Sequence, residues 1–331
     1  MTVRVAAVDC GTNSLRLLVA DVDLDRAEIR DLARLMEIVR LGQGVDKTGQ
    51  LATDALTRTI GVLREYAGII TGSAAQAVRM VATSATRDAA NAADFVHQVG
   101  DVLGVMPEVL TGAEEAMLSF TGATAELAAD HDRGPFLVVD IGGGSTEFVL
   151  GEAVPAGPEP GPDRAGTAAS ELRAISVNIG CVRLTERHLH GDPPTSPQVA
   201  AATADIDAAL DAVADAVPVS RARTLVGLAG SVTTVAAIAM GLAAYDAARI
   251  HHARVGAADV HAVTGALLAA ARSSRAKIGV MHPGRVDVIG GGALILDRLM
   301  DRFGFAEVLV SEHDILDGMA WSLARDSRGP G

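Results

Sequence analysis

The sequence predicts an α/β protein of two domains with similar size, and three observations lead to this prediction. Its 331 residues are long for a single domain. Its apolar content of 49% comes mainly from Ala, Val and Leu, with only 3% aromatic residues, which suits helices packed on sheets of small aliphatic side chains. One glycine-rich motif occurs twice, once near the N-terminus and once near the middle of the chain.

Both copies of this motif begin where a short apolar run ends. Asp140 to Glu147 reads D-I-G-G-G-S-T-E after Phe136 to Val139, and Asp9 to Arg16 reads D-C-G-T-N-S-L-R after Val3 to Val8. When the copies are aligned, four positions correspond: Asp9 with Asp140, Gly11 with Gly142, Ser14 with Ser145, and Arg16 with Glu147. We interpret the two stretches as an internal repeat with one copy in each domain.

Each copy is a candidate phosphate-binding loop. Residues without a Cβ let backbone N–H groups come close to an anion, and an adjacent hydroxyl adds a further contact. A glycine cluster can also form a tight hairpin turn that binds nothing, and a single motif does not separate the two interpretations. The repetition favours phosphate binding.

Composition and charge exclude several classes of protein. The formal charge of −13 argues against a general surface for nucleic acid or anionic membranes. The only cysteines, Cys10 and Cys181, lack the spacing of a zinc site or a disulfide framework, so we expect a reducing, cytoplasmic compartment without a signal peptide. The uncharged stretch Thr224 to Tyr245 is long enough to span a bilayer, but its glycines predict a strand, a turn and a buried helix.

The first half of the chain predicts alternating strands and helices. Val3 to Val8 and Leu15 to Val22 are expected to form a hairpin around the first loop. An amphipathic helix over Asp54 to Thr71 and a strand over Ala77 to Ala82 follow. Asn91 is placed to cap the next helix, which Gly104 ends.

Two places in this half carry candidate catalytic side chains. Arg87 is expected in a loop after the strand Ala77 to Ala82, either as a solvated surface residue or as a ligand contact, since open α/β sheets bind ligands at the carboxyl ends of their strands. Thr111 precedes a helix with Glu114 and Glu115 in its first turn. These carboxylates either complement the helix dipole, or one of them faces a cleft as a general base.

The second half predicts a similar order of elements. Thr146 to Leu150 is expected to pair with Leu172 to Asn178, so the Pro/Gly-rich segment between them is interpreted as an exposed loop, and the domain boundary is placed near Ala128 to Gly134. A helix is predicted from Pro197 to about Ala216, with Ser196 as its N-cap. Strands are predicted at 224–228, 286–289 and 307–310, with helices after the glycines at 229–231 and 290–292. A last helix is predicted to end at about Ala324, with Ser311 and Asp314 as its cap.

With these residues identified, the chain resembles the exopolyphosphatase and guanosine pentaphosphate phosphohydrolase family, within the superfamily of acetate kinase, sugar kinases, Hsp70 and actin. The matching motifs run in family order over almost the whole chain: D-C-G-T-N-S-L-R at 9–16, T-S-A-T-R-D-A-A-N at 83–91, T-G-A-E-E-A at 111–116, D-I-G-G-G-S-T-E at 140–147, N-I-G-C-V-R-L at 178–184, G-L-A-G-S-V-T-T at 227–234 and S-E-H-D-I-L-D-G at 311–318. Thr12 stands where the family more usually has serine.

The resemblance implies two ribonuclease-H-like, actin-like ATPase domains that face each other across a cleft. It implies a first domain over residues 1–130 that the C-terminal helix at about 311–325 completes, and a second over 131–310 with the exposed loop at about 152–171. Longer family members carry further C-terminal helical domains, so this chain resembles the short form.

The resemblance also assigns roles to the site residues. Glu115 matches the catalytic carboxylate that activates water, and Glu114 is its less favoured neighbour. Arg16 and Arg87 are expected to contact the transferred phosphoryl group. The phosphate-binding residues are Gly11, Thr12, Asn13 and Ser14 in the first loop and Gly142, Gly143, Gly144 and Ser145 in the second. Asp9, Asp140 and Glu147 are expected to hold Mg²⁺ or another divalent cation.

Three activities compete under this resemblance. We expect processive hydrolysis of terminal phosphate from inorganic polyphosphate, and guanosine pentaphosphate is the alternative substrate. A non-catalytic sensor of guanosine tetra- or pentaphosphate has no need for so many carboxylates, and a kinase of the superfamily does not explain the matches at Glu115 and Arg87. The family leads us to expect a homodimer that binds neither nucleic acid nor membrane and that guanosine tetraphosphate can inhibit.

Overall fold

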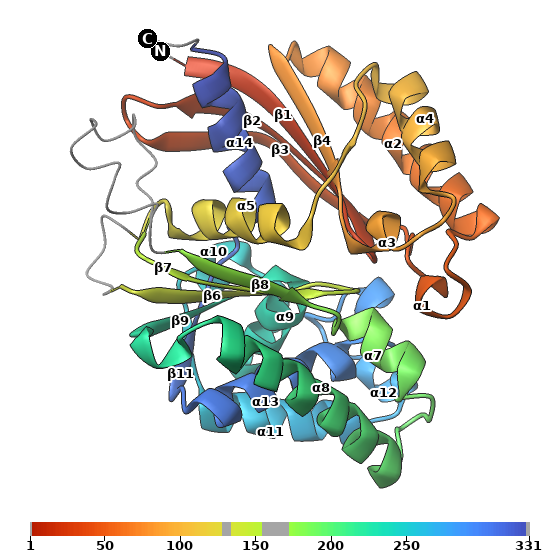
Figure 1. Ribbon diagram of the computed structural model, residues 1–331, viewed down its shortest axis with the longest axis vertical. Helices are drawn as coiled ribbons and strands as arrows, with labels where there is room; N and C mark the ends of the chain where they lie inside the picture. Colours follow the sequence, from red (N-terminus) through yellow and green to blue (C-terminus); the bar gives the residue numbers. More distant parts are fainter. Residues whose placement is uncertain (1, 128–133, 154–171, 329–331) are drawn as a thin grey trace. The chain divides into compact units, whose positions relative to one another are not determined.

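The computed structural model describes residues 2–127, 134–153 and 172–328. They form two compact units (Figure 1). The first unit holds residues 2–127 and 314–328, and the second holds residues 134–152 and 173–313. The loop expected at about 152–171 lies almost wholly outside the described residues, as does most of the expected boundary at 128–134.

The first unit is built on a five-stranded sheet with the order β3-β2-β1-β4-β5. β1 pairs antiparallel with β2, and β2 with β3, whereas β4 and β5 run parallel to β1. The strands are β1 (Thr2–Cys10), β2 (Ser14–Asp23), β3 (Glu28–Ile38), β4 (Ala77–Ala82) and β5 (Glu108–Val109). The helices are α1 (Val45–Thr48), α2 (Thr53–Ser73), α3 (Ser84–Arg87), α4 (Ala92–Leu103), α5 (Gly112–Thr124) and α14 (Ile315–Asp326).

The two faces of this sheet carry separate cores, because successive side chains of a strand point to opposite faces. Ala6 and Val8 of β1 belong to the core that contains residues of α2 and α4. Val5 and Ala7 belong to the core that contains Met319 and Trp321 of α14. Asp9 follows the alternation of Val5 and Ala7, so its side chain lies on the α14 face.

The second unit has a six-stranded sheet with the order β10-β11-β9-β6-β7-β8. Five of these strands, all except β10, repeat the topology of the first sheet. β6 pairs antiparallel with β7, and β7 with β8, whereas β9 and β11 run parallel to β6. The strands are β6 (Phe136–Ile141), β7 (Thr146–Gly151), β8 (Arg173–Val177), β9 (Thr224–Leu228), β10 (Arg254–Gly256) and β11 (Glu307–Val310). This shared order is that of ribonuclease-H-like domains and confirms the predicted fold class.

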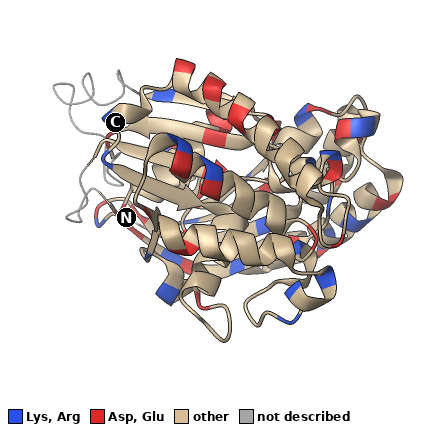
Figure 2. Ribbon diagram, turned by 90° about the horizontal axis from the view of Figure 1, so that it is seen from below, with Lys and Arg blue, Asp and Glu red and all other residues tan. Residues whose placement is uncertain are grey.

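The helices of the second unit cover its sheet with small aliphatic side chains from α8, α9, α11 and α13. They are α7 (Cys181–Arg187), α8 (Ser196–Ala216), α9 (Ala229–Ala239), α10 (Ala247–Ile250), α11 (Ala257–Ala269), α12 (Arg272–Arg275) and α13 (Ile289–Phe303), with 3-10 turns at Val219–Arg221 and Pro283–Arg285. Figure 2 shows Lys and Arg (blue) interspersed with Asp and Glu (red) along the ribbon. Helices α8 and α13 are joined by ion pairs such as Asp207–Arg298 and Asp211–Arg302.

Four predictions about local structure are wrong. Residues 286–289 form turns and the start of α13 instead of a strand, because this short apolar run packs into the helical core. Thr195, not Ser196, caps α8, and Gln198 completes its capping box. Arg87 ends the one-turn helix α3 and does not lie in a loop. Ser311 takes no part in capping α14, which Asp314 caps together with Asp317.

The apolar stretch at 224–245 folds into β9 and the largely buried α9, as predicted, but α9 follows β9 directly at Ala229, without the expected turn between them. Among the described residues, no helix combines the length and the apolar character needed to cross a bilayer.

Candidate functional site

The repeated motifs form equivalent hairpins in the two units. Asp9 lies directly opposite Arg16 in the β1–β2 ladder, and Asp140 lies directly opposite Glu147 in the β6–β7 ladder. In both turns the glycine amide donates to the carbonyl of the serine three residues later, at 3.0 Å from Gly11 to Ser14 and 3.1 Å from Gly142 to Ser145. The alignment made from sequence therefore describes two superimposable turns.

The first loop is supported from behind by neighbouring segments. The carbonyls of Thr12 and Asn13 accept hydrogen bonds from residues 39–42, and the Thr12 hydroxyl lies 2.8 Å from that of Ser84 on α3. Within the part of the chain that the structure describes, the amides of Thr12 and Asn13 donate to no protein group. The loop therefore offers two N–H groups to an anion, and the Thr12 hydroxyl, which was predicted to contact phosphate, forms a hydrogen bond with Ser84.

The second loop rests on the start of α7. The amides of Cys181 and Val182 donate to the carbonyls of Gly142 and Gly143, at 3.0 and 2.9 Å. Gly180 permits this approach, because a Cβ there would lie 2.4 Å from the Gly143 carbonyl oxygen. Among the described residues, none accepts a hydrogen bond from the amides of Gly143 or Gly144. These amides correspond to those of Thr12 and Asn13.

Arg16 lies between two buried carboxylates. Its Nε and Nη2 donate to Oδ2 of Asp9 at 2.9 and 2.7 Å, and its Nη1 donates to Oδ2 of Asp314 at the start of α14. Asp9 is only 3% exposed and Asp314 only 6%. Burial raises the pKa of Asp9 above its usual range, and Arg16 opposes this shift.

In the second unit the corresponding pair consists of two acids. Asp140 is 8% exposed and its cross-strand neighbour Glu147 is 1% exposed. Ser176 on β8 donates to Oε1 of Glu147 at 2.7 Å. Like charges placed directly opposite each other in a sheet destabilise it, so this pair favours the presence of a cation.

Glu115 and Arg87 form an ion pair in the first unit. Nη1 of Arg87 lies 3.3 Å from Oε2 of Glu115 and donates to the carbonyl of Leu110 at 2.7 Å. Glu115 is 9% exposed, in the first turn of α5. Glu114 instead forms the capping box with Thr111, whose N–H and hydroxyl hold the pKa of Glu114 below its usual range. The structure thus separates the two carboxylates: Glu114 caps α5, and Glu115 pairs with Arg87.

A sequence profile of the Ppx/GppA phosphatase family matches residues 18–326. The chain belongs to this family. Exopolyphosphatase 2 of Mycobacterium tuberculosis is 50% identical to it over 332 aligned residues, which cover 97% of this chain and 98% of that protein. The crystal structure of an exopolyphosphatase-like protein, 41% identical, superposes with a TM-score of 0.89 and covers 98% of this chain and 100% of that one.

Another Ppx/GppA-type relative is longer. The guanosine-5'-triphosphate,3'-diphosphate pyrophosphatase of Aeromonas salmonicida is 27% identical over 96% of this chain, but the match covers only 59% of that protein. The resemblance noted from the motifs is therefore confirmed at the level of the family.

Ppx/GppA membership raises the question whether a divalent cation fits the carboxylates described above. Oδ1 of Asp9 is buried and has no hydrogen-bond partner within the described ranges. Asp140 and Glu147 supply further carboxylate oxygens in the second unit, and hard cations such as Mg²⁺ prefer such oxygen ligands. Asp140 and Glu147 thus offer two carboxylates to a divalent cation, and Asp9 offers the single oxygen Oδ1.

Two residues of this Ppx/GppA site were not among the candidates. Asp314 was interpreted only as a helix cap, yet its second carboxylate oxygen binds Arg16. Ser176 was placed only on a strand, and it holds Glu147. A sequence signal existed for Asp314, since it belongs to the last matching motif, whereas nothing in the sequence marks Ser176.

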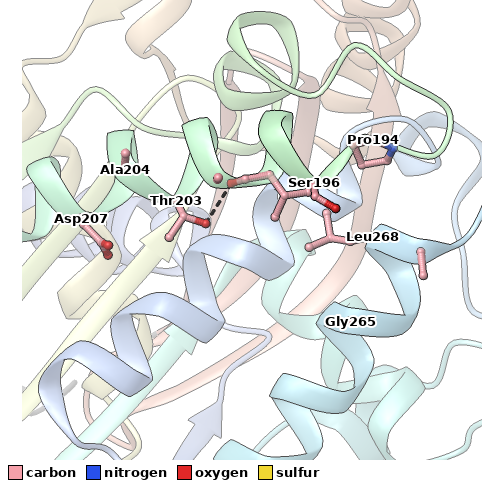
Figure 3. A pocket seen from close by; sticks show the side chains of 10 residues that line it. Pro194, Ser196, Thr203, Ala204, Asp207, Gly265 and Leu268 are labelled. Atoms are coloured by element: carbon pink, nitrogen blue, oxygen red, sulfur yellow. Dashed lines mark hydrogen bonds between the residues drawn. The ribbon is translucent and has the colours of Figure 1, made fainter.

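A hollow of about 620 Å³ lies elsewhere in the second unit, between α8 and α11 (Figure 3). Its walls include Val199, Thr203, Gly265 and Leu268, and the Thr203 hydroxyl donates to the Val199 carbonyl of its own helix. None of the residues predicted to bind phosphate or metal lines this hollow. It is therefore not part of the phosphatase site.

Proposed function

We propose that this Ppx/GppA phosphatase is an exopolyphosphatase that removes terminal phosphate from inorganic polyphosphate with the help of a divalent cation. The observation that carries the proposal is the buried Glu115 carboxylate, held by Arg87 at the start of α5. Membership of the family already makes the chain a phosphoanhydride hydrolase. The proposal adds the substrate and the roles of individual residues.

Glu115 is proposed to orient the attacking water and to accept its proton. A general base must be ionised before the attack, and both the Arg87 guanidinium and the N-terminal turn of α5 favour the ionised carboxylate. Arg87 then has two tasks: it holds Glu115 and supplies positive charge close to the phosphoryl group as negative charge develops there. Its bond to the Leu110 carbonyl fixes it in place for both.

The two turns are proposed to hold phosphate oxygens through their backbone. Thr12 and Asn13 in the first unit, and Gly143 and Gly144 in the second, supply the amides that lack a protein acceptor among the described residues. Amide pairs in such turns bind anions without adding net charge. Gly11, Ser14, Gly142 and Ser145 shape the turns through their own i to i+3 bonds.

Asp9, Asp140 and Glu147 are the proposed cation ligands. When bound, a cation would neutralise negative charge on the substrate and on the carboxylates that hold it, such as Asp140 and Glu147, which lie opposite each other in one ladder. The expected contact of Arg16 with the phosphoryl group is less well supported, because its guanidinium already binds Asp9 and Asp314. We therefore propose Arg16 as the counter-ion of Asp9.

We propose polyphosphate and not guanosine pentaphosphate as the substrate, because a relative that matches this chain over nearly its whole length carries the name exopolyphosphatase. The pyrophosphatase relative has a large additional part that this chain does not match. We also propose that the protein is a cytoplasmic homodimer that binds neither nucleic acid nor membrane and that guanosine tetraphosphate can inhibit. The buried, unbridged Cys10 and Cys181 are consistent with a reducing compartment.

Phosphate release from polyphosphate, guanosine pentaphosphate and ATP tests this function. Wild type is assayed with Mg²⁺ and with chelator, beside the Glu115→Gln variant. We expect cation-dependent release that is fastest with polyphosphate and is lost in the variant. Release only from guanosine pentaphosphate would favour the alternative substrate. Tight binding of guanosine tetraphosphate without any release would favour a sensor.

A further inference from the structure

Asp314 is held in place by two hydrogen bonds that do not involve Arg16, and Arg34 supports one of them. Its Oδ1 accepts the amide of Leu316 at 3.0 Å, and its own amide donates to Oδ2 of Asp317 at 2.9 Å. Arg34 on β3 in turn binds both carboxylate oxygens of Asp317, at 2.6 and 3.2 Å. The position of Asp314 is therefore fixed by α14 and by β3, and only Oδ2 of Asp314 contacts Arg16.

The backbone of Asp314 is also fixed against α5. A Cβ on Gly122 would lie 1.9 Å from the Asp314 carbonyl oxygen, and a Cβ on Gly318 would lie 2.0 Å from that of Leu118. The start of α14 and the middle of α5 therefore meet backbone to backbone. Such contacts leave Asp314 little freedom to follow Arg16 if that side chain turned away.

This arrangement determines how Arg16 meets Asp9. Both bonds from Arg16 end on Oδ2 of Asp9, and the buried Oδ1 has no partner among the described residues. One guanidinium is shared by two carboxylates, so with both of them ionised the three side chains carry a net charge of −1. With a neutral residue at position 314, Arg16 would neutralise Asp9 completely and would be free to bridge both of its oxygens.

The geometry points to Asp314 as a positioning residue for cation binding. Asp314 holds Arg16 on the Oδ2 side of Asp9, so that Oδ1 of Asp9 is left for a divalent cation. Asp314 also offsets part of the positive charge of Arg16, so that Asp9 keeps a net negative charge toward that cation. This inference rests on the proposed function, in which Asp9 is a cation ligand. Side chains that orient a metal ligand from behind alter metal affinity by roughly 10- to 100-fold when they are replaced.

The test separates the two jobs of Asp314. Asn and Ser are both good helix N-caps, so Asp314→Asn and Asp314→Ser keep the cap of α14 but remove the charge beside Arg16. Asp246→Asn is the matched control, because Asp246 caps the short helix α10 in the second unit through its side chain. Binding of Mg²⁺ and of Mn²⁺ is measured by calorimetry without substrate, together with thermal unfolding and phosphate release over a range of Mg²⁺ concentrations.

We expect both Asp314 variants to raise the dissociation constant of the cation about tenfold. The rate at saturating Mg²⁺ and the KM for polyphosphate should stay close to wild type, and the Asp246→Asn control should match wild type in every assay. An unchanged dissociation constant in both variants would overturn the inference, and so would a loss of rate that no Mg²⁺ concentration restores. Absence of cation binding to wild type would overturn it as well.

Failure of the proposed function looks different. If wild type releases no phosphate but binds the cation, and the Asp314 variants bind it more weakly, the positioning role of Asp314 stands while the exopolyphosphatase proposal falls.

Discussion

Nη1 of Arg87 lies 3.3 Å from Oε2 of Glu115, although the two residues come from different helices, α3 and α5, and are 28 positions apart. Leu110 connects them, since its carbonyl accepts from the same Arg87 nitrogen and it closely precedes α5. The pair links the end of β4 with the start of α5. A substitution that removes Arg87 therefore removes a contact of the carboxylate that we propose as the general base.

Replacing Glu115 with Gln should reduce kcat by roughly 10²- to 10⁴-fold, because the amide cannot accept a proton from water. The measurement is phosphate release at saturating substrate and Mg²⁺. Glu114→Gln is the matched control: it removes one carboxylate from the same turn, but Gln still serves in a capping box, so activity should persist. Equal loss in both variants would mean that the helix start, and not Glu115 itself, is what matters.

Glu147→Gln should stabilise the metal-free protein, because Asp140 and Glu147 lie opposite each other and repel. We expect a gain of about 1 kcal/mol in the free energy of unfolding in chelator, together with loss of the stabilisation that Mg²⁺ gives to wild type. Thermal unfolding with and without Mg²⁺ measures both. Asp215→Asn on α8 has the same change in net charge and should show neither effect. A less stable metal-free Glu147→Gln variant would contradict the repulsion.

Gly122→Ala should destabilise the first unit by roughly 3 kcal/mol, because its Cβ would overlap the Asp314 carbonyl oxygen. Denaturant unfolding measures this loss. Gly68→Ala is the control: it is also a helical glycine, on α2, with nothing within 4 Å of the added Cβ. That variant should gain about 0.5 to 1 kcal/mol from its higher helix propensity. Opposite signs for the two substitutions are the expected result.

Asp21→Asn should lower stability at neutral pH but not in acid. Hydrogen bonds from Arg4 at 2.7 Å and from Arg30 at 2.6 Å hold the pKa of Asp21 below the usual aspartate value. A carboxyl whose pKa is lower in the folded state stabilises the protein above its unfolded pKa of about 3.9, and that contribution is lost as the pH falls through the folded value.

The expected deficit of this variant is about 1 kcal/mol at pH 7, since the arginines are partly exposed. Unfolding curves for both proteins at several pH values should converge below about pH 4. A deficit that stays constant in acid would point to lost packing instead of lost charge.

The repeat could be predicted from sequence because its signals are local. Glycine turns after apolar runs placed both hairpins, and the cross-strand register pairs Asp9 with Arg16 and Asp140 with Glu147 as the alignment requires. Strand β3 gave no comparable signal, because it is a mostly exposed edge strand rich in charged residues. The apolar run at 286–289 gave a misleading one, because a short buried segment has the same composition in a strand and at a helix start.

Long-range contacts in the site had no local signal. Arg16 and Asp314 are 298 positions apart, and only the folded chain shows that a helix cap also binds an arginine of the first hairpin. The bond between Thr12 and Ser84 is of the same kind. The sequence predicts Thr12 as a phosphate contact, and only the folded chain shows that its hydroxyl also holds the loop on α3.

The first unit is formed from two parts of the chain with the whole second unit between them. During synthesis on the ribosome, the hairpin with Asp9 and Arg16 and the helix with Glu115 emerge long before α14 does. Until α14 emerges, Arg16 lacks the carboxylate of Asp314, and the backbone at Gly122 lacks the helix that packs on it. The first unit therefore completes its packing around Arg16 and Gly122 only after the second unit has been translated.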